Sequence, residues 1–283
     1  MNEIDRIVEI GIDALKNASK VHDELEDKGL EPVQMNDHGD CSLVGDIEAE
    51  KAVIETFRAS GIPLRIVSEE HGQVDLSDDP QFLAVLDGLD GTSVYKEARG
   101  KKRYGTMFGV FSSLDPVYDD YIFSGIMELS NKLLYYSVKN EGCHLLRDGD
   151  IVQIGCSAVS ELVDAAIHVD EFFDADRGST FIHDTYLAKL DGHDFINENS
   201  SAIRYVDLVE GQADLVLECT RKGNLEIAVA FGLVTEAGGV IVTKDGVSIG
   251  NKKYLLLGQD KYIPVISASN IELAKKLIDE ICP

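Results

Sequence analysis

Two aspartates at the end of an apolar run are the side chains best suited to chemistry in this sequence. Residues 83–95 read LAVLDGLDGTSVY, where Asp87 and Asp90 close the run and Gly91-Thr92 follows. A strand here delivers Asp87 to its carboxyl end, and the turn carries Asp90 back toward the same point. Two adjacent carboxylates repel each other, and one is driven toward protonation unless a cation removes that penalty. Mg²⁺ prefers such oxygen ligands and binds phosphate alongside one or two carboxylates.

The Gly91-Thr92 step adds an anion site to this corner. We expect it to open a helix, whose first backbone N–H groups lack helical partners and, with the helix dipole, attract an anion. The stretch therefore predicts a phosphate-binding site with an adjacent metal site. An Asp-x-x-Asp-Gly sequence is also frequent as a plain Asx turn at a strand end, and the stretch alone leaves this alternative open.

Further acids lie where other elements begin or end. The preceding β-rich run ends in IVSEEHG with Glu69 and Glu70, and an apolar helix beginning near GNLEIAVAFG carries Glu226 in its first turn. Asp46 stands at the start of an expected helix over 46–60. Taken singly, Glu226 is explained as a partner of the helix dipole and Asp46 as an N-cap.

The order of these pieces resembles the inositol monophosphatase family. That family belongs to a superfamily of Mg²⁺-dependent, lithium-sensitive phosphatases that also holds fructose-1,6-bisphosphatases. The resemblance spans most of the chain and rests on five stretches in the family's order: GDCSLVGDIEAEKAV (39–53), SEEHG (68–72), LDGLDGT (86–92), SAIRYVDLVEGQADLVLE (201–218) and LEIAVAFGLVTEAGG (225–239).

The resemblance implies a role for each matching residue. Asp46, Glu69 and Thr92 would be catalytic, because they orient the attacking water, and Asp46 would also help hold a third metal. The cofactor would be two or three Mg²⁺ ions, with Mn²⁺ as a substitute. The implied metal ligands are Glu69, Asp87, Leu89 through its carbonyl, Asp90 and Glu226. The implied substrate contacts are Asp90, Gly91, Thr92, Ala202 and Glu218.

The sequence departs from the family's usual pattern at three places. Gly88 replaces the proline of Asp-Pro-x-Asp-Gly-Thr, which loosens the turn in the unfolded chain. Leu225-Glu226 replaces Trp-Asp, in a chain that contains no tryptophan, and Val94 replaces an asparagine. The extra methylene of Glu226 would shift or weaken one metal, and together the departures leave the substrate preference and the occupancy of that metal site open.

One dense basic cluster follows the phosphate turn. In ARGKKRY (98–104) the cations are Arg99, Lys101, Lys102 and Arg103, in a chain that is otherwise acidic. One interpretation is a solvated loop that offsets nearby acids. The other is an arm that binds substrate phosphate oxygens or a second phosphate, as on fructose 1,6-bisphosphate.

We therefore expect a phosphoric monoester hydrolase. The reaction would be Mg²⁺-dependent hydrolysis of a sugar or polyol phosphate monoester, inositol 1-phosphate and/or fructose 1,6-bisphosphate, by an activated water without a phosphoenzyme. The sequence offers no obvious Cys-His or Ser-His pair that demands a covalent intermediate. Two other functions stay open: a 3′-phosphoadenosine 5′-phosphate phosphatase, and a cation-binding regulatory protein in which Leu225-Glu226 no longer supports turnover.

Composition limits the partners and the location. The formal net charge of −25 argues against nucleic acid and against an anionic membrane, since both would be repelled. The five cysteines form no CxxC motif and fit reduced thiols of a cytoplasmic protein. No run approaches the ~18 apolar residues that a bilayer span needs. A small-molecule substrate is expected, and the resemblance implies a homodimer or higher homo-oligomer.

Hydrophobic periodicity predicts the elements that position these residues. Apolar residues at three- and four-residue intervals predict a first helix near 4–15. Short β-rich runs at hairpin spacing up to residue 138 predict an antiparallel sheet. After residue 150, strand and helix candidates alternate, which is typical of an α/β half with a mixed sheet. Later helices are expected near 200–211, 224–237 and 270–281, the last capped by Asn270.

Two halves follow from this change of style. The N-terminal α+β half, 1–150, would carry the metal and phosphate motif. The C-terminal α/β half, 151–283, would carry the substrate residues and the late metal ligand Glu226. Together with the family resemblance, this implies a layered αβαβα sandwich.

Overall fold

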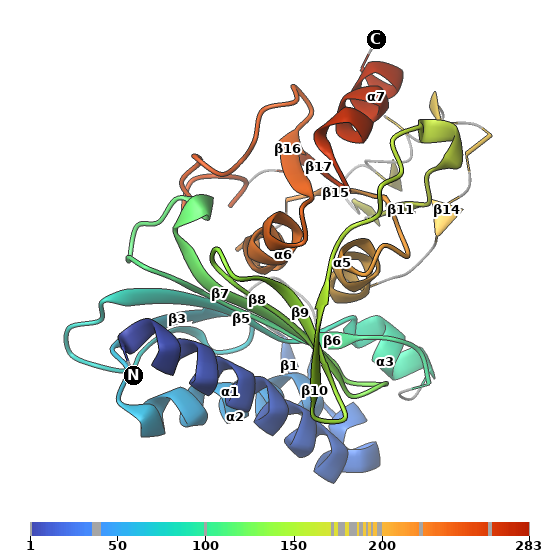
Figure 1. The fold of residues 1–283 in the computed structure, drawn as a ribbon. Helices are drawn as coiled ribbons and strands as arrows, with labels where there is room; N and C mark the ends of the chain where they lie inside the picture. The colour runs from blue at the N-terminus through green and yellow to red at the C-terminus, as the bar shows by residue number, and fades with distance from the viewer. Residues whose placement is uncertain are drawn as a thin grey trace.

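Helices and sheets alternate in five layers in the computed structural model (Figure 1). The layers are α1 (Glu3–Leu25) with α2 (Val44–Ser60), a large sheet, α5 (Ser201–Val209) with α6 (Leu225–Glu236), a second sheet, and α7 (Ile271–Ile281). This arrangement confirms the αβαβα sandwich. The structure describes residues 2–35, 41–98, 101–170, 173–174, 179–180, 186, 189–190, 192–193, 195–196, 200–220, 223–259 and 262–282.

The large sheet has eight strands in the order β10-β9-β8-β7-β6-β5-β3-β4. Neighbouring strands are antiparallel except β3 and β5, which run parallel and therefore end at the same edge. Glu69 follows β3 directly, so this edge brings it beside the end of β5. The strands are β3 (Leu64–Ser68), β4 (Gly72–Asp75), β5 (Phe82–Asp90), β6 (Gly105–Phe111), β7 (Tyr121–Glu128), β8 (Leu133–Val138), β9 (Gly142–Arg147) and β10 (Asp150–Ile154).

Helices α1 and α2 cover one face of this sheet. The Asn2 side chain caps α1 by accepting the Asp5 N–H at 2.8 Å. α1 then buries a stripe at helical spacing that includes Ile7, Ala14 and Ala18. A 3₁₀ turn, η1 (Glu26–Leu30), and a hairpin of β1 (Pro32–Met35) and β2 (Cys41–Leu43) lead from α1 to α2.

The second sheet is mixed and has the order β14-β11-β15-β17-β16. β11 lies parallel to β14 and β15, whereas β17 lies antiparallel to β15 and β16. Asn270 caps α7, because its side chain accepts the Leu273 N–H at 2.9 Å. The remaining described elements are α3 (Thr92–Ala98), η2 (Tyr118–Asp120), η3 (Leu162–Asp164), β11 (Ile167–Val169), β12 (Phe173–Asp174), β13 (Ser179–Thr180), β14 (Phe195–Ile196), β15 (Leu215–Cys219), β16 (Val240–Thr243) and β17 (Pro264–Ala268).

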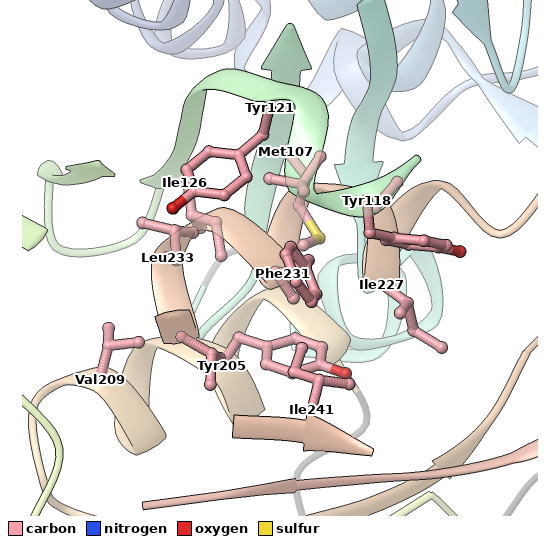
Figure 2. Packing of buried hydrophobic residues seen from close by; sticks show 14 of the residues in the cluster. Met107, Tyr118, Tyr121, Ile126, Tyr205, Val209, Ile227, Phe231, Leu233 and Ile241 are labelled. Atoms are coloured by element: carbon pink, nitrogen blue, oxygen red, sulfur yellow. The ribbon is translucent and has the colours of Figure 1, made fainter. Parts of the chain in front are cut away.

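One hydrophobic core joins α5 and α6 to the large sheet. Figure 2 shows Phe231 of α6 between side chains of that sheet and of α5, and its ring centroid lies 5.6 Å from that of Tyr118 and 5.9 Å from that of Tyr121. The same buried cluster contains Met107 from β6 and Tyr205 from α5. The large sheet continues through β10 to Ile154, and the boundary near residue 150 stays a prediction.

The structure bears on two expectations from composition: the lack of a membrane-spanning run and the reduced cysteines. None of the described helices combines the length and the apolarity that a bilayer crossing requires. The five cysteines are free thiols: Cys41, Cys143, Cys156, Cys219 and Cys282.

Candidate active site

A β-bulge at the end of β5 turns Asp87 and Asp90 toward one another. β5 pairs with β6 at Asp87 opposite Met107 and again at Asp90 opposite Gly105, so one strand advances by one residue more than the other. Side chains alternate along a regular strand, which would send residues three apart to opposite faces. The extra residue of a bulge cancels that alternation. Inside the bulge, the Asp87 carboxylate accepts the Leu89 N–H at 2.9 Å.

Glu226 completes an acidic cluster with Asp87 and Asp90, and these three residues form the acidic corner of the site. Each of the three side chains offers a carboxylate oxygen, and these oxygens all lie within 4.8 Å of one another. Asp87 and Asp90 are buried, and Glu226 is half-buried at the start of α6. Among the residues that the structure describes, no other trio of acidic, histidine or cysteine side chains is close enough to share one ion. The cluster has the donor type and the spacing of a site for a hard divalent cation.

The start of α5 holds Asp90 in place. The Asp90 carboxylate accepts the backbone N–H of Ala202 at 2.7 Å and also the hydroxyl of Ser200. Ala202 therefore contacts Asp90 through its backbone N–H, and its expected position facing the substrate stays a prediction. Ser200 was not among the predicted site residues; it is also the N-cap of α5.

Burial and mutual repulsion raise the pKa values of the clustered acids. Burial, followed by the charges of Glu69, Asp90 and Glu226, holds the pKa of Asp87 well above its ordinary value. Burial and the charges of Glu226 and Glu70 do the same to the pKa of Glu69. Glu69 thus belongs to the same electrostatic unit as the cluster. A divalent cation relieves this repulsion, so the residues present fit such an ion.

Asp46 and Thr92 form a hydrogen-bonded pair beside the cluster. The Thr92 hydroxyl lies 2.8 Å from the Asp46 carboxylate and 3.0 Å from the Leu89 carbonyl oxygen. Asp46 is not the N-cap of α2. The helix begins at Val44, and the Asp46 carboxylate reaches back to accept the Leu43 N–H at 2.7 Å. Burial raises the pKa of Asp46 to about 7, although the hydrogen bonds from Leu43 and Thr92 oppose that shift.

Glu226 follows a buried turn at Asn224, which was not predicted from the sequence. Asn224 adopts the left-handed backbone conformation, with φ of 47°, immediately before α6. Its side-chain amide donates to the Tyr118 hydroxyl and, at 3.3 Å, to the Leu257 carbonyl. The Tyr254 hydroxyl donates to the Gly223 carbonyl at 2.6 Å. Two tyrosines therefore support the segment where the family's usual pattern has a tryptophan.

Glu218 lies in a buried polar group on β15. Its carboxylate accepts the Tyr205 hydroxyl and lies 3.6 Å from the Arg204 guanidinium, which also donates to Asp170 at 3.0 Å. Arg204 and Glu218 are each buried. The predicted contact of Glu218 with substrate hydroxyl groups stays a prediction.

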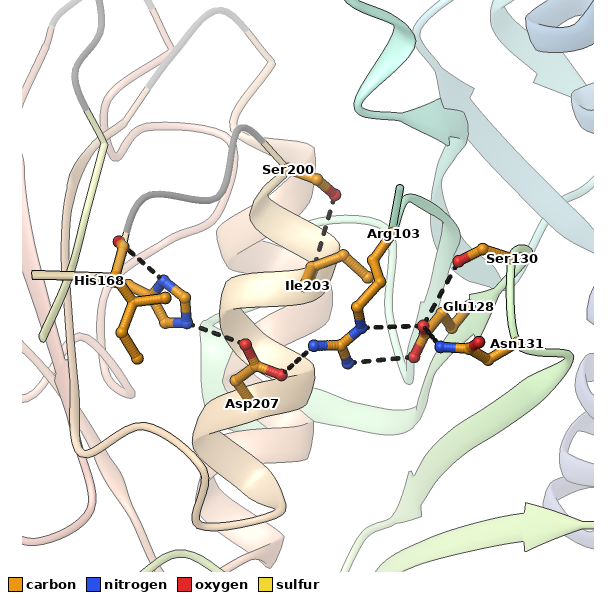
Figure 3. A network of polar contacts seen from close by, with 9 residues as sticks. Arg103, Glu128, Ser130, Asn131, His168, Ser200, Ile203 and Asp207 are labelled. Atoms are coloured by element: carbon orange, nitrogen blue, oxygen red, sulfur yellow. Dashed lines mark hydrogen bonds and ion pairs between the residues drawn. The ribbon is translucent and has the colours of Figure 1, made fainter. Parts of the chain in front are cut away.

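The basic cluster after α3 divides into separate parts. Arg99 lies outside the described residues, and Lys101 and Lys102 are exposed. Arg103 instead binds the buried Glu128 through two hydrogen bonds, of 2.9 and 3.1 Å, and donates to Asp207 at 2.6 Å (Figure 3). This engagement of the guanidinium with two carboxylates gives Arg103 a structural role, and its substrate role stays a prediction.

His168 continues this network on the far side of Asp207. Its Nε2 lies 3.1 Å from the second Asp207 oxygen, and the ring is fully buried (Figure 3). The network joins the segment after α3 to β7, α5 and β11. It therefore connects the large sheet, α5 and the second sheet through polar contacts.

Comparisons with known proteins agree with this geometry. The sequence model of the inositol monophosphatase family matches residues 3–279. The fructose-1,6-bisphosphatase/inositol-1-monophosphatase of Methanothermobacter thermautotrophicus is 25% identical over 271 residues, and the match covers 90% of this chain and 88% of that protein. The bifunctional NADP phosphatase/NAD kinase of Methanocaldococcus jannaschii is 22% identical, and the match covers 94% of this chain but 50% of that protein.

Solved structures share the fold over nearly the whole chain. The extragenic suppressor protein suhB from Bartonella henselae superposes with a TM-score of 0.78 at 18% identity and covers 97% of both chains. The inositol monophosphatase from Anabaena gives a TM-score of 0.75 at 16% identity and covers 100% of this chain and 98% of its own. Because the family model matches residues 3–279, the chain belongs to the inositol monophosphatase family, a family of phosphoric monoester hydrolases.

Proposed function

We propose that the chain hydrolyses a sugar or polyol phosphate monoester, inositol 1-phosphate and/or fructose 1,6-bisphosphate, in a Mg²⁺-dependent reaction without a phosphoenzyme. The observation that carries the proposal is the convergence of Asp87, Asp90 and Glu226 within 4.8 Å, next to the hydrogen-bonded pair of Thr92 and Asp46. The three carboxylates offer a binding site for cations, and the Asp46 carboxylate beside them can accept a proton.

We assign two or three Mg²⁺ ions, replaceable by Mn²⁺, to the acidic corner. The ligands in this proposal are Glu69, Asp87, the Leu89 carbonyl, Asp90 and Glu226. Hard carboxylate oxygens and the raised pKa of Asp87 support this assignment, because a divalent cation offsets the effects of burial and of neighbouring acids that raise this pKa. When bound, Mg²⁺ supplies positive charge to the phosphate oxygens and lowers the pKa of a nearby water.

The chain's own residues manage the proton of that water. Glu69 and Thr92 orient the water, and its proton passes to Oγ1 of Thr92 as Thr92 gives its own proton to Asp46. A carboxylate whose pKa is raised to about 7 suits this task, because a general base works best with a pKa near the working pH. Gly91 and Thr92 contact the phosphate through their backbone, and Asp90 is held still by Ser200 and Ala202.

The relatives support a sugar phosphate as the substrate class. One is named a fructose-1,6-bisphosphatase/inositol-1-monophosphatase and another a bifunctional NADP phosphatase/NAD kinase. Each phosphatase name refers to a phosphate monoester on a polyol or a sugar. In the proposal Ala202 and Glu218 face the substrate, and Lys101 and Lys102 bind a second phosphate. We also propose a cytoplasmic enzyme that works as a homodimer or higher homo-oligomer, since free cysteines and the family resemblance agree with this setting.

Phosphate release from a substrate panel tests the proposal. The panel contains inositol 1-phosphate, fructose 1,6-bisphosphate, NADP and 3′-phosphoadenosine 5′-phosphate, each with Mg²⁺ and with EDTA. We expect Mg²⁺-dependent release from one of the first two. Asp90→Asn should lower kcat/KM by more than about 100-fold, because loss of an outer-shell partner alone costs metal sites 10–100-fold. The exposed Asp78→Asn is the matched control. Near-parental turnover by Asp90→Asn in saturating Mg²⁺ would end the proposal.

A further inference from the structure

Glu50 is a fully buried carboxylate that lies outside the proposed set of ligands. It is 0% exposed and belongs to α2. Buried carboxylates need several donors to remain stable. Glu50 has them, because it accepts the Ser68 hydroxyl at 2.8 Å and a ring nitrogen of His71 lies at 2.7 Å. Neither contact involves a proposed metal ligand.

The remaining donors to Glu50 come from the backbone that carries Glu69. Its carboxylate accepts the N–H groups of Glu69 at 3.0 Å, Glu70 at 3.2 Å and His71 at 3.2 Å. These consecutive amides form the turn between β3 and β4. Such a run of backbone N–H groups around one anion is a strong, charge-assisted arrangement. One carboxylate therefore fixes the path of the turn at the point where Glu69 leaves β3.

The same helix presents Asp46 one turn earlier. Asp46 and Glu50 are four residues apart, so they share a face of α2. Gly88 of β5 packs against α2, because a Cβ atom there would sit 2.5 Å from the Asp46 carbonyl oxygen and 2.6 Å from Cγ of Glu50. α2 is thus pressed against the acidic corner, and Glu50 reaches past Gly88 to the turn at Glu69.

We propose that Glu50 is a positioning residue for the cation site: it holds the Glu69 backbone so that the Glu69 carboxylate faces Asp87 and Glu226. This role depends on the proposed function in one respect: it takes Glu69 as a ligand of the divalent cation. Glutamine cannot replace Glu50, because both carboxylate oxygens accept hydrogen bonds. The NH₂ group of glutamine would stand in place of one oxygen and would face donors there. The role differs from plain support of the hairpin, which would affect stability without changing cation affinity.

The test compares Glu50→Gln with Glu55→Gln, an exposed glutamate on the same helix. Thermal unfolding followed by circular dichroism checks that each variant folds, and calorimetry measures the affinity of the metal-free protein for Mn²⁺. We expect Glu50→Gln to weaken the tightest Mn²⁺ site by 10–100-fold, the loss usual for an outer-shell partner. We also expect faster hydrogen exchange at the amides of residues 69–71. Glu55→Gln should match the parent in both.

Two further measurements keep the outcomes distinct. If Glu50→Gln does not fold, Ser68→Ala decides, because it removes one donor to Glu50 and should weaken Mn²⁺ binding by a smaller factor. A folded variant that binds Mn²⁺ as the parent does overturns the positioning role. Mn²⁺ binding needs no substrate, so a parent that binds Mn²⁺ but releases no phosphate overturns the proposed function and leaves the role of Glu50 standing.

Discussion

The Thr92 hydroxyl donates to the Asp46 carboxylate across 2.8 Å, although the two residues are 46 positions apart in the chain. If this contact carries the proton, Thr92→Ala should lower kcat by about 100-fold at saturating Mg²⁺, the lower end of what general acid–base groups contribute. Thr92→Ser keeps the hydroxyl and should stay within about 10-fold of the parent. Initial rates of phosphate release measure both. Parental kcat in Thr92→Ala would contradict the role.

Gly88 should tolerate no side chain. A Cβ atom there would lie 2.5 Å from the Asp46 carbonyl oxygen, which belongs to helix backbone and cannot yield easily. We expect Gly88→Ala to lower the free energy of unfolding by about 1–3 kcal/mol, as overpacking does, and to lower activity as well. Urea unfolding followed by circular dichroism measures the change. Gly155→Ala is the control, because Gly155 is exposed and its nearest neighbour, the Ala237 carbonyl oxygen, would lie 3.3 Å away.

Cation binding should expel protons. The pKa values of Glu69 and Asp87 are held well above their ordinary range by burial and by neighbouring acids, so the metal-free site retains protons that a cation displaces. Affinity for Mg²⁺ should therefore rise with pH. Calorimetry near pH 7 in two buffers of different ionisation enthalpy measures the release, and identical heats in both buffers would show that none occurs. EDTA should also lower Tm, since bound Mg²⁺ stabilises the folded state.

The basic cluster should separate into a structural and a substrate-binding part. Arg103→Ala removes the cationic partner of the buried Glu128 and should lower the free energy of unfolding by about 3 kcal/mol. The double variant Lys101→Ala/Lys102→Ala removes exposed charges and should leave stability within about 0.5 kcal/mol. We expect this double variant to raise KM for fructose 1,6-bisphosphate more than for inositol 1-phosphate. Equal rises would reject binding of a second phosphate.

His22 should make stability sensitive to mild acid. Burial, and then the charge of Lys132, lowers its pKa to about 4, and both ring nitrogens lack hydrogen-bond partners among the packed rings of Tyr95 and Tyr104. The unfolded chain takes up this proton near pH 6.5, and the folded chain does so only near pH 4. The contribution to stability is therefore present above pH 6.5 and is lost as pH falls toward 4.

A leucine at this position removes the titration. Between pH 7.5 and pH 5, the free energy of unfolding should fall by about 2 kcal/mol less in His22→Leu than in the parent, since each pH unit of differential protonation corresponds to about 1.4 kcal/mol. Urea unfolding at the two pH values measures the difference. Equal losses in both proteins would show that His22 is not responsible.

The acidic corner could be predicted because much of its chemistry is local. Asp87 and Asp90 follow an apolar run within one turn, and the expected helix over 224–237 matches α6 at Leu225–Glu236. The convergence of Glu226 with the aspartates came from the family resemblance. The bulge in β5 was not predicted, since nothing in LDGLDG reveals how many residues the neighbouring strand will oppose to it.

The groups that hold the corner together could not be found in the same way. Ser200 contacts Asp90 from 110 positions away, and Glu50 contacts Ser68 and the turn after it from 18 to 21 positions away. Such pairs depend on how α2 and α5 pack against the sheet, which local pattern does not specify. For Glu50 one signal existed: it stands four residues after Asp46 and therefore shares its helix face. For Ser200 no such signal existed, because a serine at the start of a helix is fully explained as an N-cap.

Glu226 reaches the cluster from α6, on the face of the large sheet opposite α2 (Figure 1). A nascent chain that ends before Leu225 contains Asp87 and Asp90, yet it lacks the third carboxylate of the cluster. Under the proposed binding of Mn²⁺ at this cluster, uptake at full affinity would require α6 to have packed against the large sheet, so the ion would serve as a spectroscopic marker of that packing.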